Sequence, residues 1–377
     1  MSDFLIACGG TGGHLSPGIA LAQRLRARGH EVRLLISEKR IDRQLSAKYP
    51  DFRFDSIPGA PLAYSPAGFV RFLSTQLKGL LFAFRLLRES RPKVVVGFGG
   101  FTTAAIILAA WVSRIPVALH EANRVPGRAV RFMARFARRV YLPIEVELFN
   151  GYNPAKVRHA GLPVREEIKR DARHECAESF GLDVDRPTLA LLGGSQGAQA
   201  LNTWAAGAAG ELARHGIQML VVTGPGKGTG DTRSHPDAQG KPVKLVTLPF
   251  CDRMGDLLSA SDLVVSRSGA GTIAELVQCR VPAVLVPYPH AADDHQAANA
   301  AYFMRCGGGV VVKENRLANL TATVLSLLTN DDALTTCRTC LGEMSRSDAL
   351  SLMLDDLENI TRASRERPEQ PSTLLPA

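Results

Sequence analysis

The chain has 377 residues, enough for two domains that each bury a core of ordinary size. Hydrophobic residues make up 45% and charged residues 21%, proportions that exclude disorder of the whole chain. The formal net charge of +9 favours anionic partners, either phosphorylated molecules or an anionic lipid surface. Aromatic residues, at 6%, are too scarce for a surface that stacks single strands, so we expect no nucleic-acid partner.

Seven scattered cysteines, an odd number, are typical of a reducing compartment rather than of a disulfide framework. Cys337-Arg-Thr-Cys340 has no second pair to complete a zinc site, and we interpret it as structural. No secretory signal is visible, and the longest uncharged apolar run, Thr102 to Ser113, is too short to span a bilayer. These features predict a cytoplasmic protein without a transmembrane helix.

Strands and helices alternate in the first part of the chain. A helix is predicted from Ser16 to Arg28, and an apolar helix follows Gly97-Phe98-Gly99-Gly100. Buried parallel strands are predicted at residues 4–8, 32–36, 93–96, 117–120 and 139–142. The periodicity fades from Phe149 to Pro163, which we interpret as a linker.

The same order returns after the linker. A glycine turn, Gly193-Gly194-Ser195-Gln196-Gly197, precedes a helix from Ala198 to His215, and Gly224 to Pro242 is predicted as a loop. Strands are predicted at residues 188–192, 218–222, 244–247, 263–266 and 283–286. Repeated strand, glycine turn and helix predict an α/β protein with two Rossmann-like, doubly wound domains that face each other across a cleft.

The expected domain boundaries follow from these patterns. The first Rossmann-like domain takes residues 1–162 and the second takes residues 163–345. A C-terminal helix at residues 346–360 can return to the first domain. Residues 361–377, rich in Arg, Glu and Pro with little apolar content, are predicted to be a disordered tail.

The first glycine loop is Gly9-Gly10-Thr11-Gly12-Gly13-His14. Its glycines let the backbone approach a ligand, and the helix start that follows favours anions. The last glycine of a dinucleotide fingerprint would fall at Leu15, although Glu38 keeps a nicotinamide alternative open. His14 is either a structural residue or a general base, because the positive end of a helix lowers the pKa of an imidazole and keeps it neutral.

A second glycine cluster, Ser268-Gly269-Ala270-Gly271-Thr272, follows the strand at 263–266. Glu275 is either a capping-box partner of Thr272 or a carboxylate that accepts from two ribose hydroxyls. The residues alone leave both interpretations open. Gly224-Pro225-Gly226-Lys227 lacks the upstream glycine of a P-loop, which excludes that motif.

Seven segments occur in order between residues 3 and 345. They are Gly9 to His14, Gly97 to Gly100, His120-Glu121-Ala122-Asn123 with Pro126-Gly127, Gly161-Leu162-Pro163-Val164-Arg165, Gly193 to Ala198, Arg267 to Glu275, and Asp293-Asp294-His295-Gln296 up to Asn299. Together they resemble the MurG family of bacterial transferases. Members add N-acetylglucosamine to undecaprenyl-diphospho-N-acetylmuramoyl pentapeptide, lipid I, and so form lipid II for peptidoglycan.

The resemblance implies a glycosyltransferase B-type fold, with the lipid I acceptor in the first half and UDP-N-acetylglucosamine (UDP-GlcNAc) mainly in the second. It also implies an inverting transfer that forms a β-1,4 bond to the C4 hydroxyl of the N-acetylmuramoyl sugar. A UDP-GlcNAc 2-epimerase of the same architecture, a transferase with a diacylglycerol acceptor, and a non-catalytic module that binds nucleotide sugars are the alternatives.

The family's donor-binding roles can be carried over residue by residue. The resemblance implies diphosphate contacts from Arg165, Ser195 and Gln196, and a uracil contact from the backbone of Cys251. Phosphate and ribose contacts are implied for Ala270, Gly271, Thr272, Ile273, Ala274 and Glu275. Contacts near the sugar are implied for Asn123 and Gln296. The sequence departs from the family pattern at Ala122 and at Cys251.

On the acceptor side, Thr11, Gly12 and Gly13 are expected to line the cleft, and His14 is the favoured base for the acceptor hydroxyl. Arg165, backbone N–H groups and helix N-termini can stabilise the charge that develops on UDP without a metal. The Asp-x-Asp segment Asp183-Val184-Asp185 precedes a strand and lies at the wrong end of the sheet. We therefore expect no cofactor and no obligatory metal.

Two basic and apolar stretches lie in the first half. In the first, residues 69–87, the basic residues Arg71, Lys78 and Arg85 recur every seven positions. In the second, five arginines at alternating spacings of four and three predict one helix face, and they are Arg124, Arg128, Arg131, Arg135 and Arg138. Each stretch is either a core helix with a solvated basic face or a surface for anionic lipid, and some arginines can instead hold the acceptor diphosphate. We expect a peripheral protein on the cytoplasmic face of the membrane, with cell-wall synthesis proteins as further candidate partners.

Overall fold

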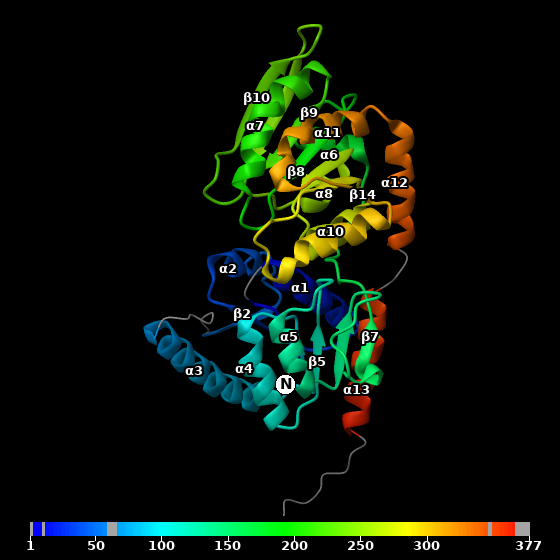
Figure 1. Ribbon diagram of the computed structural model, residues 1–377. Helices are drawn as coiled ribbons and strands as arrows, with labels where there is room; N and C mark the ends of the chain where they lie inside the picture. The colour runs from blue at the N-terminus through cyan, green and yellow to red at the C-terminus, as the bar shows by residue number, and fades with distance from the viewer. Residues whose placement is uncertain (1–2, 10–11, 59–65, 346–348, 366–377) are drawn as a thin grey trace, which may run out of the picture.

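The computed structural model describes residues 3–9, 12–58, 66–345 and 349–365. They form two α/β halves that lie one above the other, as Figure 1 shows. Each half has a central, mainly parallel sheet covered by helices, so the predicted class of two doubly wound domains is confirmed. None of the helices in this described part is long and apolar enough to cross a bilayer.

The strands of the first half pair in the order β3-β2-β1-β4-β5-β6-β7, and every pairing is parallel. They are β1 (Phe4–Ala7), β2 (Val32–Ser37), β3 (Arg53–Ile57), β4 (Val94–Gly97), β5 (Val117–His120), β6 (Arg139–Leu142) and β7 (Val157–His159). The helices are α1 (Gly12–Ala27), α2 (Arg40–Ser46), α3 (Pro66–Ser90), α4 (Phe101–Val112) and α5 (Arg128–Met133), with short 3-10 turns η1 (Ala134–Phe136) and η2 (Pro154–Lys156). The strand order reverses between β1 and β4, where doubly wound sheets bind their ligands.

The second half repeats this plan in the order β10-β11-β9-β8-β12-β13-β14, with only β10 antiparallel to its neighbour. Its strands are β8 (Thr188–Leu192), β9 (Gln218–Val222), β10 (Asp231–Pro236), β11 (Pro242–Leu248), β12 (Leu263–Ser266), β13 (Ala283–Leu285) and β14 (Gly309–Val311). Its helices are α6 (Arg173–Ser179), α7 (Gln199–Arg214), α8 (Met254–Ser259), α9 (Ala270–Cys279), α10 (His295–Arg305), α11 (Leu320–Leu328) and α12 (Asp331–Met344), with 3-10 turns η3 (Ala292–Asp294) and η4 (Glu314–Asn319). The strand order of this second sheet reverses between β8 and β12.

Burial on both faces explains why the central strands are continuous apolar runs. In β1, Leu5 and Ala7 belong to the apolar cluster on one face of the sheet, while Phe4 and Ile6 belong to the cluster on the other. The central strands of the second half alternate in the same way between two clusters. A strand covered on both sides gains from apolar residues at every position, so the sequence shows no polar alternation there.

The last described helix, α13 (Ala349–Arg365), returns to the first half after the chain has passed through the second (Figure 1). Its apolar side chains join the cluster around β1 and β4, and they include Met353, Leu354, Leu357 and Ile360. The Asp356 carboxylate accepts hydrogen bonds from Arg139 at 2.6 and 2.9 Å and from the Tyr141 hydroxyl at 2.8 Å. The helix continues to Arg365, past the expected end at residue 360, and residues 366–377 of the predicted tail lie outside the described residues.

Four strands depart from the sequence prediction. Residues 149–163, predicted as a linker, contain η2 and the edge strand β7, whose residues are partly exposed. Inside the predicted loop at 224–242, β10 forms an edge strand with mostly exposed polar side chains. The strands β3 and β14 were also missed. Edge strands are stabilised by backbone pairing to a neighbour, so their own side chains need no apolar run.

The five arginines of the second basic stretch do not lie on one helix, and that prediction is wrong. Helix α5 holds only Arg128 and Arg131 of the set, while Arg124 precedes it. Arg135 lies in η1, and Ala137 has an extended backbone (φ −83°, ψ 140°) that ends the helical run before Arg138. The first basic stretch does form one helix, α3, although the side chain of Arg71 lies outside the described part.

Candidate active site

The loops at the two points of strand-order reversal carry most of the predicted site. In the first half, residues 8–13 follow β1 and residues 98–100 follow β4. In the second half, residues 193–198 follow β8 and residues 267–269 follow β12. The helices α1 and α9, which leave these loops, contact each other across the two halves. The carboxyl edges of both sheets therefore meet at one junction.

His14 lies in the first turn of α1, close to the loop after β4. Methyl carbons built on Gly99 and Gly100 would lie 3.4 Å from the two ring nitrogens of His14, and both glycines have left-handed backbone angles (φ 92° and 84°). Burial lowers the pKa of His14 to about 4, with an opposing effect from Asp42 and a supporting one from Lys39. The direction of this shift is the one expected for His14, and burial is its largest cause. A neutral imidazole at physiological pH can accept a proton.

The neighbouring glycines fix the path of this loop. A methyl carbon on Gly9 would lie 2.2 Å from the backbone nitrogen of Ser37, so only glycine fits beside β2. Gly12 and Gly13 form the first turn of α1. Thr11 lies outside the described residues. The structure thus places His14 and Gly13 at the carboxyl edge of the first sheet, beside the loop after β4.

Glu121, to which the sequence analysis gave no role, organises the loop after β5. Its carboxylate is only 5% exposed and accepts from the backbone N–H groups of Asn123 at 2.9 Å and Gly127 at 2.8 Å. It also accepts from the Asn123 side chain at 3.1 Å. His120 donates from Nε2 to the carbonyl of Gly161 at 3.2 Å, and burial lowers its pKa to about 4. The loop that presents Asn123 is therefore held by buried polar groups.

The glycine turn after β8 presents Ser195 and Gln196 to solvent at the start of α7. Its shape depends on glycine, because a methyl carbon on Gly197, which has φ 66°, would lie 2.2 Å from the Thr223 carbonyl. No side chain caps the N-terminus of α7, which begins at Gln199. Unpaired N–H groups at a helix start favour an anion.

Arg165 and Glu275, predicted to contact different parts of the donor, lie together. The Arg165 guanidinium is 11% exposed and donates to Glu275 at 3.4 Å, to Glu167 at 3.2 Å and to the Tyr49 hydroxyl at 3.0 Å. Burial raises the pKa of the Glu275 carboxyl, and the charge of Arg165 opposes that shift. The buried Nε of Arg165 makes no hydrogen bond to any described residue. Tyr49 and Glu167 were missed because they belong to none of the motifs.

The start of α9 separates the two interpretations of Glu275. The N-cap of α9 is Gly269, with no side-chain cap, so Thr272 is the third residue of the helix and cannot be the N-cap of a capping box. Residues Ala270, Gly271, Thr272, Ile273, Ala274 and Glu275 are all half-buried along this helix. Gln296 reaches the same region, because its backbone carbonyl accepts from the Ser268 hydroxyl at 2.8 Å.

Cys251, predicted to read uracil through its backbone, follows β11 and is buried. Burial raises the pKa of its thiol. The neighbouring Phe250 ring lies 4.7 Å from the Lys48 ammonium of the first half, which also pairs with Asp252. This segment is therefore near the junction as well.

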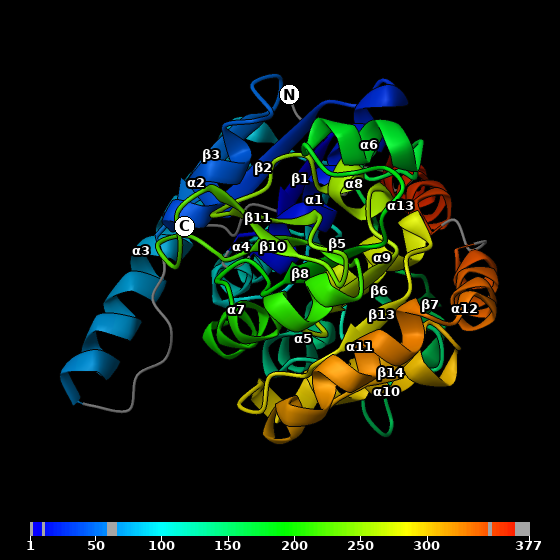
Figure 2. The same ribbon diagram turned by 90° about the horizontal axis from the view of Figure 1, so that it is seen from above.

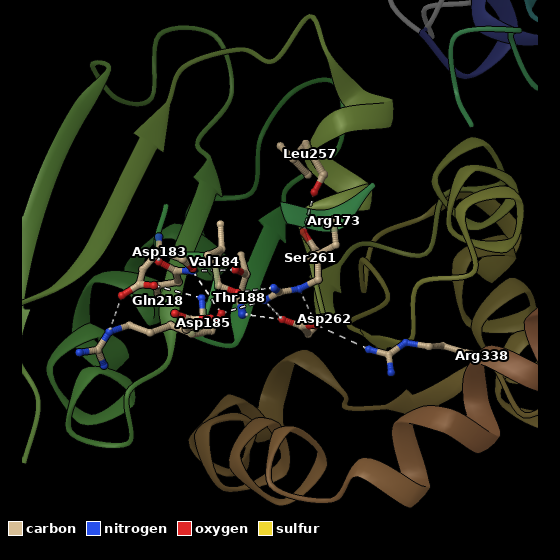
Figure 3. Close-up of polar contacts among 11 residues, drawn as sticks. Arg173, Asp183, Val184, Asp185, Thr188, Gln218, Leu257, Ser261, Asp262 and Arg338 are labelled. Carbon is tan, nitrogen blue, oxygen red and sulfur yellow. Dashed lines mark hydrogen bonds and ion pairs between the residues drawn. The ribbon is translucent and has the colours of Figure 1, made fainter. Parts of the chain in front are cut away.

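The Asp-x-Asp segment lies at the opposite, amino end of the second sheet, in the polar network of Figure 3. Asp183 accepts from the backbone N–H of Asp185 at 3.0 Å, and Asp262 accepts from Arg173 at 2.7 Å and from the backbone N–H of Thr188 at 2.9 Å. Gln218 donates to the Asp183 carbonyl at 2.6 Å. These contacts stabilise the second half. Within the described ranges, no group of three or more His, Cys, Asp or Glu side chains is arranged to hold a metal ion.

Two family models and many curated proteins match this chain. The model of the glycosyltransferase family 28 N-terminal domain matches residues 4–142, and that of the family 28 C-terminal domain matches residues 188–353. A relative from Opitutus terrae, the UDP-N-acetylglucosamine--N-acetylmuramyl-(pentapeptide) pyrophosphoryl-undecaprenol N-acetylglucosamine transferase, is 53% identical over 362 residues, which are 96% of each chain.

Solved structures share the fold. The MurG structure of Acinetobacter baumannii has a TM-score of 0.68 and 24% identity, covering 94% of this chain and 99% of its own. A Listeria monocytogenes structure described as a UDP-N-acetylglucosamine 2-epimerase has a TM-score of 0.69 at 14% identity, covering 96% and 98%. The fold alone therefore does not separate a transferase from an epimerase, whereas the sequence match does. On that match, the chain belongs to glycosyltransferase family 28 and, within it, to the MurG family of N-acetylglucosamine transferases.

Proposed function

We propose that this protein transfers N-acetylglucosamine from UDP-GlcNAc to the C4 hydroxyl of the N-acetylmuramoyl sugar of lipid I, forming lipid II. The observation that carries the proposal is the match to the transferase from Opitutus terrae, at 53% identity along 96% of both chains. The junction of the two sheets supplies the chemistry, because a neutral histidine and a buried arginine–glutamate pair come from opposite halves.

The donor is held mainly by the second half. The diphosphate lies at the N-termini of α7 and α9, near Ser195 and Gln196, where backbone N–H groups and Arg165 stabilise the negative charge that develops on UDP. The unpaired Nε of Arg165 is a donor available for this purpose. Glu275 accepts from the ribose hydroxyls, Gln296 and Asn123 contact the sugar, and the backbone of Cys251 reads the uracil. UDP is the leaving group.

The acceptor is held mainly by the first half, near the loop from Thr11 to Gly13. Its C4 oxygen attacks C1 of the donor sugar from the face opposite UDP, so that the C1–O4 bond forms while the bond from C1 to the diphosphate breaks. His14 takes the hydroxyl proton. A pKa of about 4 makes His14 a weak base in the free protein, but the negative diphosphate of a bound acceptor raises the pKa of a nearby imidazole.

The test is a transfer assay with labelled UDP-GlcNAc and a short-chain lipid I analogue, in which both UDP release and lipid-bound label are followed. The proposal expects label in the lipid that is lost in His14→Ala and Glu275→Ala, both of which should still fold. UDP release without lipid label, or free N-acetylmannosamine as product, would instead identify a hydrolase or an epimerase.

We further propose that the first half docks on the cytoplasmic face of the membrane through α3, α4 and α5. Figures 1 and 2 show α3 on one side of this half, away from α13. Exposed apolar side chains project from these three helices, including Leu81 at 62% and Trp111 at 51%, and the others are Leu77, Leu108, Val112 and Phe132. The helices adjoin, since α4 contacts both α3 and α5.

Basic residues lie beside the exposed apolar side chains of α3. Lys78, Arg85 and Arg88 are exposed on α3, and an open pocket of about 700 Å³ next to Leu81 is lined by both of these arginines. Each basic residue close to an anionic membrane contributes about 1 kcal/mol of attraction. Exposed apolar groups beside basic ones are the features expected of an interfacial surface.

Flotation with vesicles tests the docking surface. The proposal expects more bound protein on phosphatidylglycerol vesicles than on phosphatidylcholine vesicles, and a large loss for a Leu81→Glu, Trp111→Glu variant. Leu352→Glu, which changes an exposed apolar side chain of α13, is the matched control and should bind as the wild type does. Equal flotation on the two lipids would contradict the proposal.

The two domains have different proposed roles. Residues 1–162 form the acceptor and membrane domain, residues 163–345 form the UDP-GlcNAc domain, and the C-terminal helix supports the first. A place on the membrane would also bring the protein close to other enzymes of cell-wall synthesis, which are its candidate protein partners.

A further inference from the structure

The helix α10 and the residue that precedes its N-cap contact the first half of the protein at several points. Asp293 makes such contacts just before the helix, and Asn299, Tyr302 and Arg305 make them from one face of the helix. Asp293 accepts from Arg128 and Arg131 of α5, each at 3.1 Å. Both Asp293 and the next residue, Asp294, have left-handed backbone angles (φ 49° and 53°), an uncommon pair outside glycine.

The far end of the same face makes similar contacts. The Tyr302 ring lies 3.7 Å from the Arg124 guanidinium, and Arg305 pairs with Glu145. Arg124 and Glu145 are themselves 3.7 Å apart. Arg305 and Glu145 are 63% and 58% exposed, and exposed ion pairs contribute little stability. The residue at the centre of the face is buried instead.

Asn299, at the centre, is 4% exposed and is bonded to both halves at once. Its side-chain N–H₂ group donates to the Asn123 side-chain oxygen and to the Ser268 carbonyl, both at 3.1 Å. Its side-chain oxygen accepts from the backbone N–H of Arg124 at 3.0 Å. Ser268 directly precedes the glycine at the start of α9, and Asn123 is the residue expected near the sugar.

We propose that Asn299 is a positioning residue, which holds the loop that carries Asn123 in register with the start of α9 when the two halves come together. The inference rests on the proposed transferase function. Asn299 itself touches no substrate. It acts by fixing two loops from different halves, and a displacement of about 1 Å at a reacting centre can cost about a hundredfold in rate.

The contact also fixes what Asn123 can offer a ligand. Three partners determine the orientation of the Asn299 amide, so the oxygen of Asn123 faces Asn299. The amide nitrogen of Asn123 then faces Glu121, to which it donates at 3.1 Å. A carboxamide has two N–H donors, so one remains. Asn123 therefore presents an N–H donor to the sugar, suited to a hydroxyl or carbonyl oxygen.

A kinetic double-mutant cycle tests this role. We expect Asn299→Ala to lower kcat for transfer by about 10- to 100-fold, while the Kd for UDP, whose proposed contacts lie in the second half, stays within about twofold. The double variant Asn123→Ala, Asn299→Ala should be no slower than Asn123→Ala by more than about twofold, because the two residues act as one unit. Met304→Ala, an exposed α10 side chain off this face, is the control.

Two results would overturn the proposal. One is a kcat within about twofold of wild type for Asn299→Ala, and the other is a double variant whose losses multiply in full. A second measurement does not depend on activity. Hydrogen exchange should show that the Arg124 amide loses protection in Asn299→Ala and keeps it in Met304→Ala, and unchanged protection would overturn the contact itself. Wild-type protein that transfers no sugar would refute the proposed function but leave this exchange test valid.

Discussion

Replacing Glu121 by glutamine changes one buried atom of the loop that carries Asn123. The wild-type carboxylate accepts three hydrogen bonds, two at Oε1 from Asn123 and one at Oε2 from the Gly127 backbone N–H. A glutamine in the same place can keep its oxygen toward Asn123, but its N–H₂ group then faces the N–H of Gly127. Two donors face each other, and a buried N–H group is left without an acceptor.

The expected loss in the free energy of unfolding follows from the number of hydrogen bonds that each variant loses. Leaving a buried donor unsatisfied costs about 1–3 kcal/mol, so Glu121→Gln should lower the free energy of unfolding by about 2 kcal/mol. Glu121→Ala removes all three acceptor contacts and should cost about 4 kcal/mol. Because Asn123 keeps its partner only in the glutamine variant, transfer should fall about tenfold in Glu121→Gln and about a hundredfold in Glu121→Ala.

Urea unfolding and the lipid I transfer assay measure the two effects. Glu147→Gln, an exposed glutamate of the same half, is the matched control and should change neither. If Glu121→Gln unfolded at the wild-type urea concentration and transferred sugar at the wild-type rate, the buried carboxylate would not be organising this loop, and the reasoning would be refuted.

Three further predictions concern pH, donor binding and the C-terminal helix. Burial lowers the pKa of His14 and of His120 to about 4 in the folded protein, against 6.5 for an unperturbed imidazole. The unfolded chain therefore binds more protons below pH 6.5, so each histidine should cost about 2 kcal/mol of stability between pH 8 and pH 5. Urea midpoints for wild type and His120→Gln check this, and an equal pH dependence in both would contradict it. Arg165→Lys replaces the planar guanidinium group, which donates to three partners, and should weaken UDP binding about tenfold or more, as measured by calorimetry. An unchanged Kd for UDP would argue against a role of Arg165 in donor binding. Asp356→Ala leaves Arg139 without its carboxylate and should lower the free energy of unfolding by about 3 kcal/mol, and a loss under about 1 kcal/mol would show that α13 is held mainly by its apolar face.

The sequence predicted the central strands well and the edges poorly. Strands such as 117–120, 188–192 and 263–266 have the predicted bounds, because burial on both faces demands an unbroken apolar run. The edge strands β7 and β10 were missed, since their residues are largely exposed and their pairing depends on neighbours far away in the chain. Helix α1 begins at Gly12, four residues before the predicted start, because glycines that promote turns elsewhere form its first turn here.

Some features of the site could likewise be predicted from the sequence and others could not. Motifs and glycine loops were sufficient to single out His14, Arg165 and Glu275 as candidate site residues. They did not reveal that Arg165 bonds to Glu275, nor that Asn299 bonds to Asn123, because such contacts depend on how two separately folded sheets meet. The regular spacing of five arginines led to the wrong prediction of a single helix face for a related reason. A helical period was present, but a 3-10 turn at Ala134–Phe136 interrupts the helix.

The sugar linkage in the isolated product distinguishes an inverting transferase from every alternative activity. Product made from UDP-GlcNAc and a short-chain lipid I analogue can be purified, and the anomeric proton coupling and the linkage position of its disaccharide can be determined by NMR. The expected product is N-acetylglucosamine joined by a β bond to the C4 oxygen of the N-acetylmuramoyl sugar. An α-linked product, attachment at another oxygen, or recovery of only free sugar would contradict the proposed transfer.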